Sequence, residues 1–267
     1  MITIREYVRP ATLEEAWTLN QKRTSRVLGG MLWLKMQHAA VGTAIDLSGL
    51  GLDTVEETPE EFTIGAVVSL RALETNAALD AYTNGAVREA LRHIVGVQFR
   101  NTATLGGSVY GRFGFSDVLT LLLAMNASVE LYKGGIVPLA QFAEMPFDRD
   151  ILVRVHIPKE SAAFFYQSVR NSQTDIPVLT CAAARLETGD YRIAIGARPL
   201  RAVRFELPAE PALAAEQLAA QFAESVKAQI VTGSNMRGSA EYRRHLAGVL
   251  TKRAVLELEQ RKMQEEK

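Results

Sequence analysis

Two pairs of adjacent glycines place the strongest constraint on what this chain can fold into. Gly29-Gly30 interrupts the apolar segment Val27–Trp33, and Gly106-Gly107 interrupts the segment Arg100–Ser108. Glycine has no Cβ, so it adopts positive φ and lets the backbone approach another group closely. Successive N–H groups in such turns form a concavity that binds anions. The two pairs therefore predict two loops that hold one phosphate-bearing ligand.

The usual nucleotide-binding motifs do not account for these loops. Neither G-x-G-x-x-G nor G-x-x-x-x-G-K-[ST] occurs in the sequence. Downstream, Ser116 is predicted to cap the buried helix Val118–Met125, which places Asp117 in the first turn. Asp117 either complements the helix dipole or accepts hydrogen bonds from a ribose or similar diol, and its spacing leaves both readings open.

Composition excludes several classes of function. The 267 residues are 48% apolar and carry 30 basic and 30 acidic side chains, so the formal net charge is zero. Such a chain forms one or two domains and has no overall field that attracts nucleic acid or an anionic membrane. The first residues show no signal-peptide pattern, and no apolar run approaches the roughly 18 residues that span a bilayer. We expect a cytoplasmic protein that binds neither nucleic acid nor membrane.

Metal and nucleophilic chemistry find no support in the sequence. Cys181 is the single cysteine, which excludes an internal disulfide and a cysteine-ligated cluster or zinc site held by this chain alone. Its apolar, strand-like setting predicts a buried, inert thiol. No H-E-x-x-H unit or catalytic triad pattern is present, so we predict no metal site and no catalytic residue. The four histidines are His38, His93, His156 and His245.

The order of predicted elements is mixed α and β. Near the N-terminus we expect a helix from the capping box Thr12–Glu15 to Lys22, a strand at Arg26–Leu28, a helix at Leu32–His38, and strands at Ala44–Ser48 and Glu61–Val67. A short helix capped by Ser69 and a helix at Ala86–Val95 follow. Strands Ala127–Tyr132 and Ile136–Leu139 then flank a tight hairpin at Lys133–Gly135. From about Lys159 we expect strands Phe164–Arg170, Leu179–Leu186 and Tyr191–Gly196, then helices Pro211–Lys227 and Ser239–Gln260. The segment Pro158–Ser161 is the predicted domain boundary.

Several segments, taken in order, carry a family resemblance. They are Leu28–Leu32, Thr104–Ser108, Asp117, Ile151–Pro158, Phe164–Arg170 with Asp175, and Arg237–Arg244. With these segments the chain resembles the FAD-binding medium subunit of molybdenum hydroxylases, the xanthine dehydrogenase and CO dehydrogenase flavoprotein family. The resemblance implies an α+β fold in which a bipartite FAD-binding domain of the vanillyl-alcohol-oxidase or PCMH type covers residues 1–158, with subdomains of about 1–53 and 54–158. A smaller α+β domain of the CO dehydrogenase flavoprotein type follows at 159–267.

The resemblance also implies a cofactor, partners and a site. FAD in this chain would receive electrons from the [2Fe–2S] clusters of an iron–sulfur subunit, after substrate oxidation in a molybdopterin-binding large subunit, and pass them to NAD⁺ or another acceptor. The chain would be an FAD-dependent oxidoreductase subunit that is incomplete alone. The residues expected to contact FAD are Val27, Leu28, Gly29, Gly30, Met31, Leu32, Trp33, Ile94, Asn101, Thr104, Gly106, Gly107, Ser108, Asp117, Ile151, Leu152 and Gln167.

Departures from the family pattern keep alternatives open. Met31 stands where family members commonly have Thr, His or Asn, and Gln167 stands where Lys is frequent. Arg112 either supplies the missing cation or crowds the pocket, and Trp33 either stacks on a ring of FAD or fills the core. The alternatives are a degenerate, flavin-free scaffold subunit and a stand-alone FAD oxidoreductase. For Arg237–His245 we favour a structural role over partner binding, and we expect Arg170 and Asp175 to form an internal ion pair.

Overall fold

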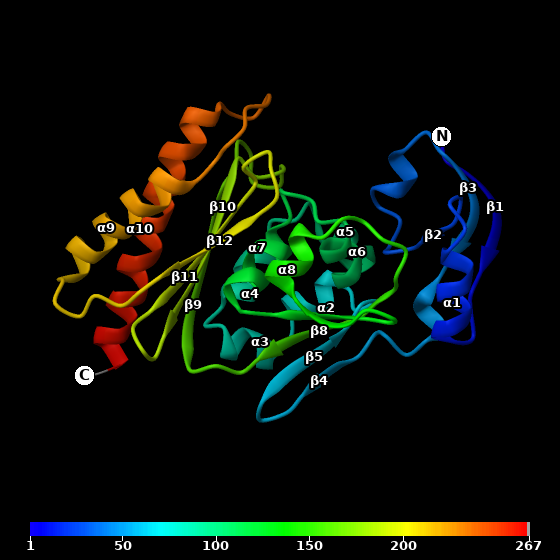
Figure 1. Ribbon diagram of the computed structural model, residues 1–267, viewed down its shortest axis with the longest axis horizontal. Helices are drawn as coiled ribbons and strands as arrows, with labels where there is room; N and C mark the ends of the chain where they lie inside the picture. The colour runs from blue at the N-terminus through cyan, green and yellow to red at the C-terminus, as the bar shows by residue number, and fades with distance from the viewer. Residues whose placement is uncertain (266–267) are drawn as a thin grey trace. The chain divides into compact units, whose positions relative to one another are not determined.

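The computed structural model describes residues 1–265 and divides into two compact units that alternate along the chain (Figure 1). Unit 1 comprises Met1–Leu73, Val97–Gly111 and Ala127–Lys159, and unit 2 comprises Glu74–Gly96, Arg112–Asn126 and Glu160–Lys267. The units are therefore interleaved, whereas the expected division into 1–158 and 159–267 is continuous and stays a prediction.

Unit 1 begins with a parallel sheet in the order β1-β3-β2. The elements are β1 (Thr3–Val8), α1 (Leu13–Asn20), β2 (Arg26–Val27) and β3 (Ala40–Ile45). β3 pairs in parallel with both neighbours. As predicted, Thr12 caps α1, because its side chain accepts a hydrogen bond from the N–H of Glu15 at 3.1 Å. The Glu15 carboxylate accepts from the N–H of Ala11, one residue earlier than in a standard capping box.

The second sheet of unit 1 has five strands in the order β4-β5-β8-β6-β7, all antiparallel pairs. Its strands are β4 (Val55–Glu57), β5 (Glu61–Gly65), β6 (Ser128–Leu131), β7 (Gly135–Pro138) and β8 (Leu152–Pro158). The short helices along these parts of the chain are α2 (Leu70–Glu74), α5 (Val97–Thr102), α6 (Leu105–Tyr110) and α8 (Leu139–Glu144). The predicted glycine hairpin is confirmed, with Leu131 opposite Gly135 in the register of β6 and β7. One core cluster of this unit joins Ala16, Ile45 and Ile151.

Unit 2 is a layered α/β/α arrangement around one antiparallel sheet in the order β12-β11-β10-β9. Its strands are β9 (Ala162–Val169), β10 (Leu179–Leu186), β11 (Tyr191–Gly196) and β12 (Val203–Leu207), and its helices are α3 (Ala77–Tyr82), α4 (Ala86–Leu91), α7 (Asp117–Ala124), α9 (Ala215–Gln229) and α10 (Ala240–Glu265). Figure 1 shows α9 and α10 side by side on one face of this sheet. α7 contacts β10 and β11, and α4 contacts β9.

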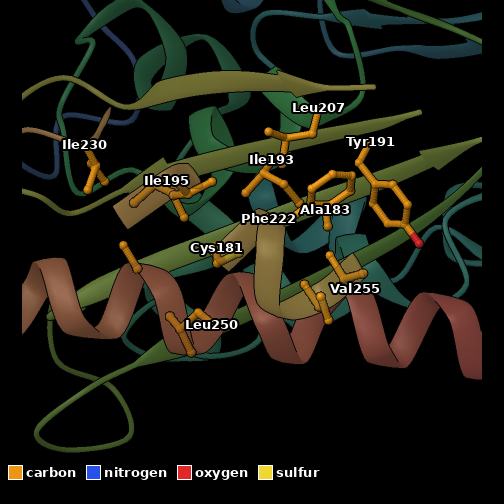
Figure 2. Packing of buried hydrophobic residues seen from close by; sticks show 14 of the residues in the cluster. Cys181, Ala183, Tyr191, Ile193, Ile195, Leu207, Phe222, Ile230, Leu250 and Val255 are labelled. Carbon is orange, nitrogen blue, oxygen red and sulfur yellow. The ribbon is translucent and has the colours of Figure 1, made fainter. Parts of the chain in front are cut away.

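The core between this sheet and the pair α9–α10 is the large apolar cluster shown in Figure 2. Cys181, Ile193 and Ile195 of the sheet lie among side chains from the two helices, including Phe222 and Leu250. Every one of these residues is almost completely buried. The expectation that Cys181 is a buried thiol is confirmed, and burial raises its pKa to about 12.

Several predicted elements are confirmed and others are shorter. β10 and β11 match the predicted strands, and Ser116 caps α7 through the N–H of Leu119 at 3.1 Å. The helix expected at Leu32–His38 is only the 3-10 turn η1 (Leu34–Met36), and the strand expected at Ala44–Ser48 ends at Ile45, where Asp46 caps a second 3-10 turn, η2 (Leu47–Gly49). The turn η1 ends because Gln37 is extended, with φ of −81° and ψ of 154°, and Met31 just before the predicted helix has a positive φ.

Within residues 1–265, no helix combines the length and the apolar character that crossing a bilayer requires. The same residues contain no cluster of His, Cys, Asp and Glu arranged to hold a metal ion. His156 instead lies on the polar face of the five-stranded sheet, with Nδ1 3.1 Å from Glu61 and Nε2 3.5 Å from Glu130.

Candidate functional site

The first glycine loop has the backbone of an anion-binding turn. Gly30 has φ of 84° and Met31 has φ of 61°, so two consecutive residues adopt left-handed conformations. Such a φ costs a residue with a side chain of order 1–3 kcal/mol, and residues of this kind are concentrated at active sites and ligand-binding sites. Within the part of the chain that the structure describes, the N–H groups of Gly29, Gly30 and Met31 donate no hydrogen bond. Three consecutive donors are therefore open to a ligand.

The flanks of the first loop are anchored in unit 1. Leu28 continues from β2 and donates its N–H to the carbonyl of Ile45 at 2.9 Å. Trp33 lies edge-on to Phe99 of α5, with ring centroids 6.4 Å apart, and its side chain stays partly exposed. Asn101 belongs to the same helix α5. Trp33 is thus neither a fully buried core residue nor free of packing, so its predicted contact with FAD stays a prediction.

The second glycine loop is the N-terminus of the short helix α6. Thr104 caps this helix, and its Oγ1 accepts a hydrogen bond from the N–H of Gly107 at 3.1 Å. The N–H of Leu105 donates to the carbonyl of Val68 at 2.9 Å, and the N–H of Gly106 donates to the carbonyl of Ala66 at 2.8 Å. The backbone donors of this loop are therefore already used inside unit 1, unlike those of the first loop.

The two loops meet backbone to backbone. A Cβ built on Gly29 would lie 2.8 Å from Cα of Gly107, and one built on Gly107 would lie 2.8 Å from the carbonyl oxygen of Gly29. A Cβ on Gly30 would overlap the carbonyl group of Thr102. The structure thus brings together the two predicted loops, and glycine is required at these positions because the loops touch each other.

Asp117 lies in unit 2, at the first position of α7, and is held by two partners. Its Oδ1 accepts a hydrogen bond from the Tyr166 hydroxyl at 2.5 Å and forms an ion pair with the guanidinium of Arg170. All three side chains are almost completely buried. Burial raises the pKa of the Asp117 carboxyl, while Arg170 and the Tyr166 hydroxyl act in the opposite direction. Among the described residues, its Oδ2 receives no side-chain donor.

The expected pair of Arg170 and Asp175 takes a different form. Arg170 pairs with the carboxylate of Asp117 and donates only to the backbone carbonyl of Asp175, at 2.5 Å. The Asp175 carboxylate pairs with Arg237 at 3.0 Å. Sequence reasoning missed Tyr166 and Arg170 as partners of Asp117. Tyr166 lies on β9 and Arg170 directly follows that strand, but nothing in the local sequence pattern marks either as a partner of Asp117.

The remaining residues predicted to contact FAD lie in different parts of the two units. Gln167 of β9 donates to the carbonyl of Leu250 in α10 at 2.7 Å, so its amide is on the helical face of the sheet, whereas Tyr166 is on the face that carries Asp117. The structure therefore does not bring Gln167 and Asp117 together. Ile151 and Leu152 are buried in unit 1, and Ile94 follows α4 in unit 2. Contacts of these residues with FAD stay predictions.

The arginines considered in the sequence are mostly structural. Arg112 is only 4% exposed and has φ of 45°, so its side chain does not reach solvent as a free cation. Arg243 is completely buried and donates to the carbonyl groups of Val178, Gly233 and Gly238 and to the side chain of Asn235. Ser239 caps α10 through the N–H of Tyr242. These hydrogen bonds lie within the chain. They favour a structural role for much of the segment Arg237–His245 over the binding of a partner protein.

Comparison with known proteins agrees with this architecture. The family described as the FAD binding domain in molybdopterin dehydrogenase matches residues 3–160, and the CO dehydrogenase flavoprotein C-terminal domain matches residues 163–258. The xanthine dehydrogenase FAD-binding subunit of Escherichia coli O157:H7 is 27% identical, over 96% of this chain and 97% of that one. The uncharacterized protein YgfM of E. coli K12 is also 27% identical, over 92% and 93%. The carbon monoxide dehydrogenase structure from Hydrogenophaga pseudoflava shares the fold, with a TM-score of 0.85 at 23% identity over 94% of this chain and 95% of that one.

A domain of this type followed by this C-terminal domain defines an FAD-binding oxidoreductase subunit. The chain belongs to the family of FAD-binding domains of molybdopterin dehydrogenases, and it is a medium, FAD-binding subunit of the kind found in molybdenum hydroxylase complexes. The resemblance, the α+β fold class and FAD as the cofactor, all predicted from the sequence, are confirmed.

Proposed function

We propose that this chain receives electrons from the [2Fe–2S] clusters of an iron–sulfur subunit and passes them through FAD to NAD⁺ or another acceptor. Substrate oxidation would take place in a molybdopterin-binding large subunit. The single observation that carries the proposal is the run of open N–H donors at Gly29, Gly30 and Met31, in a chain of an FAD-binding family. When bound, flavin supplies a junction that accepts electrons singly and releases them as a pair.

The first loop fits a diphosphate without a cationic side chain. Consecutive N–H groups around left-handed residues form concavities that bind phosphate oxygens. The Thr104 hydroxyl adds one donor. Its Oγ1 accepts a hydrogen bond from the N–H of Gly107, so the hydroxyl hydrogen can be donated to a ligand, and Oγ1 lies 3.3 Å from the Cβ position of Gly29. Met31 contributes through its backbone, which any side chain at this position retains. The departure from the family's Thr, His or Asn therefore leaves the phosphate donors of the loop intact.

Asp117 is proposed as an acceptor for a hydroxyl group of the nucleotide. Tyr166 and Arg170 both donate to Oδ1, and among the described residues Oδ2 receives no side-chain donor. A carboxylate held by two donors keeps its charge and orientation better than one that is free to rotate. This role rests on the geometry of unit 2 alone and stays a proposal.

The first test is the visible absorption spectrum of the purified chain, before and after FAD is added, with the released cofactor identified after denaturation. We expect a flavin band, FAD in the supernatant, and loss of the band in Gly30→Val, which removes the required backbone conformation. Met31→Gly is the matched control, since it preserves the backbone donors and relieves the strain. Failure of the wild-type chain to bind added FAD would refute the proposal and support the flavin-free scaffold.

The second test addresses electron transfer and separates the remaining alternative. Reduction of the bound flavin by NADH in the isolated chain would support NAD⁺ as the acceptor, since hydride transfer is reversible. Reduction by a small organic substrate without any partner subunit would instead support the stand-alone oxidoreductase. If the flavin is reduced by dithionite but by neither NADH nor a small substrate, the acceptor is not a nicotinamide, and the electron-transfer proposal then depends on reduction by the iron–sulfur subunit.

A further inference from the structure

We propose that unit 2 carries a further ligand site, a pocket that binds a small amino acid as its zwitterion. The pocket lies where β10 ends and β11 begins, and it shares no residue with the two glycine loops or with Asp117 and its partners. Its volume is about 390 Å³, and small-molecule sites typically measure about 300–1,000 Å³. Seven of its eight lining residues are polar, so the pocket suits a small polar ligand and not an apolar one.

Arg192 of β11 lines this pocket as a buried cation with too few partners. Its side chain is 5% exposed, and its Nη2 pairs with the carboxylate of Glu160. Within the described residues, its buried Nε and Nη1 have no hydrogen-bond acceptor, so at least three of the five N–H donors of the guanidinium are unused. Buried donors are usually paired, and an unpaired one is costly. Arg192 therefore gains from a ligand that brings a further acceptor.

The carboxylates of the pocket leave one negative charge without a partner. Glu206 lies opposite Arg192 in the register of β12 and β11, but its Oε1 pairs with Nε of Arg204 at 2.8 Å. Glu160 is paired with Arg192. Glu187, in the hairpin between β10 and β11, is exposed and forms no ion pair with any of residues 1–265. The pocket thus holds one unpaired carboxylate and one incompletely paired guanidinium.

These two groups require opposite charges on one small molecule. A carboxylate suits Arg192, because a guanidinium donates two parallel hydrogen bonds to its oxygens, and an ammonium group suits Glu187. A simple anion would meet the three carboxylates of the lining, whereas a simple cation would leave the unused donors of Arg192 without an acceptor. An amino acid carries both groups, and the number of carbons between them sets the distance that it spans.

Glu160 holds the position at Arg192 that the ligand carboxylate would take. Its side chain is 30% exposed, and its Oε1 also accepts a hydrogen bond from Nδ2 of Asn126 at 3.0 Å. Glu160 uses only Nη2 of the guanidinium, whereas a free carboxylate can bind Nη2 and Nε together. Because Nε is buried, the ligand reaches it by displacing Glu160. Loss of Glu160 should therefore strengthen binding and loss of Arg192 should abolish it, and a purely structural ion pair predicts neither effect.

Isothermal titration calorimetry of the purified chain tests the proposal with three probes, glycine, β-alanine and γ-aminobutyrate, whose charges lie progressively further apart. Propionate and propylamine carry one charge each and are the matched ligand controls. We expect at least one of the three amino acids to bind and neither control to do so. Arg192→Met and Glu187→Gln should each weaken binding at least tenfold, and Glu160→Gln should strengthen it at least threefold. Glu224→Gln is the control variant, because Glu224 is an exposed carboxylate of α9 and pairs with Lys227 outside the pocket; it should leave affinity unchanged.

Lack of binding of all three amino acids to the wild-type chain would overturn the proposal. Binding of propionate as tight as that of the best amino acid would overturn it too, because the site would then be a simple anion site. The same holds for binding that Glu187→Gln leaves unchanged or that Glu160→Gln does not strengthen. Circular dichroism identifies a variant that does not fold, and Glu187→Gln, a change at an exposed hairpin position, decides the outcome if Arg192→Met unfolds. The titrations are made with and without added FAD, so their result does not depend on the flavin site.

Discussion

Replacing Arg170 with methionine removes the charged partner of a buried carboxylate. The side chains of Arg170 and Asp117 are 7% and 6% exposed, so neither group is well solvated. Methionine keeps the apolar stem and leaves Asp117 with the Tyr166 hydroxyl, 2.5 Å away, as its remaining side-chain donor. Removing one partner of a buried ion pair costs about 3–5 kcal/mol, because the other charge stays buried without compensation. We expect Arg170→Met to destabilise the chain by an amount near the lower end of this range.

Urea unfolding of the FAD-free chain measures this loss. With a slope of about 3 kcal/mol per molar urea, a loss of about 3 kcal/mol lowers the midpoint by roughly 1 M. The control is Lys227→Met, which breaks an ion pair with Glu224 whose side chains are 40% and 73% exposed. Such exposed pairs contribute about 0–1 kcal/mol. A midpoint shift in Arg170→Met no larger than that in Lys227→Met would refute the reasoning.

The pH dependence gives the same prediction a second test. Burial already raises the pKa of Asp117, and loss of Arg170 raises it further, so the folded variant takes up a proton more readily than its unfolded chain. The penalty is therefore fully present at pH values above the folded pKa. It shrinks as the pH falls toward the unfolded value of about 3.9, because protonation neutralises the buried group. We expect a larger midpoint difference between wild type and Arg170→Met at pH 8 than at pH 5, and a difference that grows on acidification would contradict this account.

Three further predictions follow from single residues. Met31→Gly should keep FAD affinity within about threefold of wild type and raise the melting temperature of the FAD-free chain, because glycine adopts positive φ without strain; a large loss of affinity would show that the side chain itself contacts the ligand. Cys181 should not react with a thiol reagent at pH 8 until urea unfolds the chain, because burial raises its pKa to about 12, and rapid reaction of the native chain would contradict its burial. Burial by itself raises the pKa of Glu259, but hydrogen bonds from Tyr191 and Arg185 outweigh this effect and lower that pKa. The stabilisation by the ionised carboxylate is therefore complete above the unfolded pKa of about 4.3 and is lost as the pH falls further. Thermal unfolding should show that wild type loses its stability advantage over Glu259→Gln on acidification below this value.

Local patterns of the sequence were sufficient for the elements that depend on near neighbours. The apolar content of Leu179–Leu186 and Tyr191–Gly196 indicates β10 and β11, and the side chains of Thr12 and Ser116 cap the helices that they precede. Caps and hairpins are closed by residues a few positions apart, so their chemistry can be read directly. The helix expected at Leu32–His38 was wrong, because the backbone becomes extended at Gln37, directly after the 3-10 turn Leu34–Met36.

The site was predictable in part. The two glycine pairs marked two loops that the fold does bring together, and the order of the motifs indicated the family. The sequence could not show that Gly107 contacts Gly29, because that contact joins residues far apart in the chain. Nor could the sequence show which carboxylate pairs with Arg170. Asp117 and Asp175 carry the same charge, and only the distances in the folded chain show that Arg170 forms its ion pair with Asp117.

The sequence by itself thus determined the family, the cofactor class and the elements built from short-range patterns. The tertiary structure alone decided which backbone donors are open to a ligand. The N–H groups of Gly30 and Gly106 are chemically identical, but the fold supplies the carbonyl of Ala66 as an acceptor for Gly106 and, among residues 1–265, no acceptor for Gly30. It also decided that segments 74–96 and 112–126 pack with the C-terminal sheet. Hydrogen-bond partners and packing neighbours are properties of positions in space, and the sequence specifies them only through the complete fold.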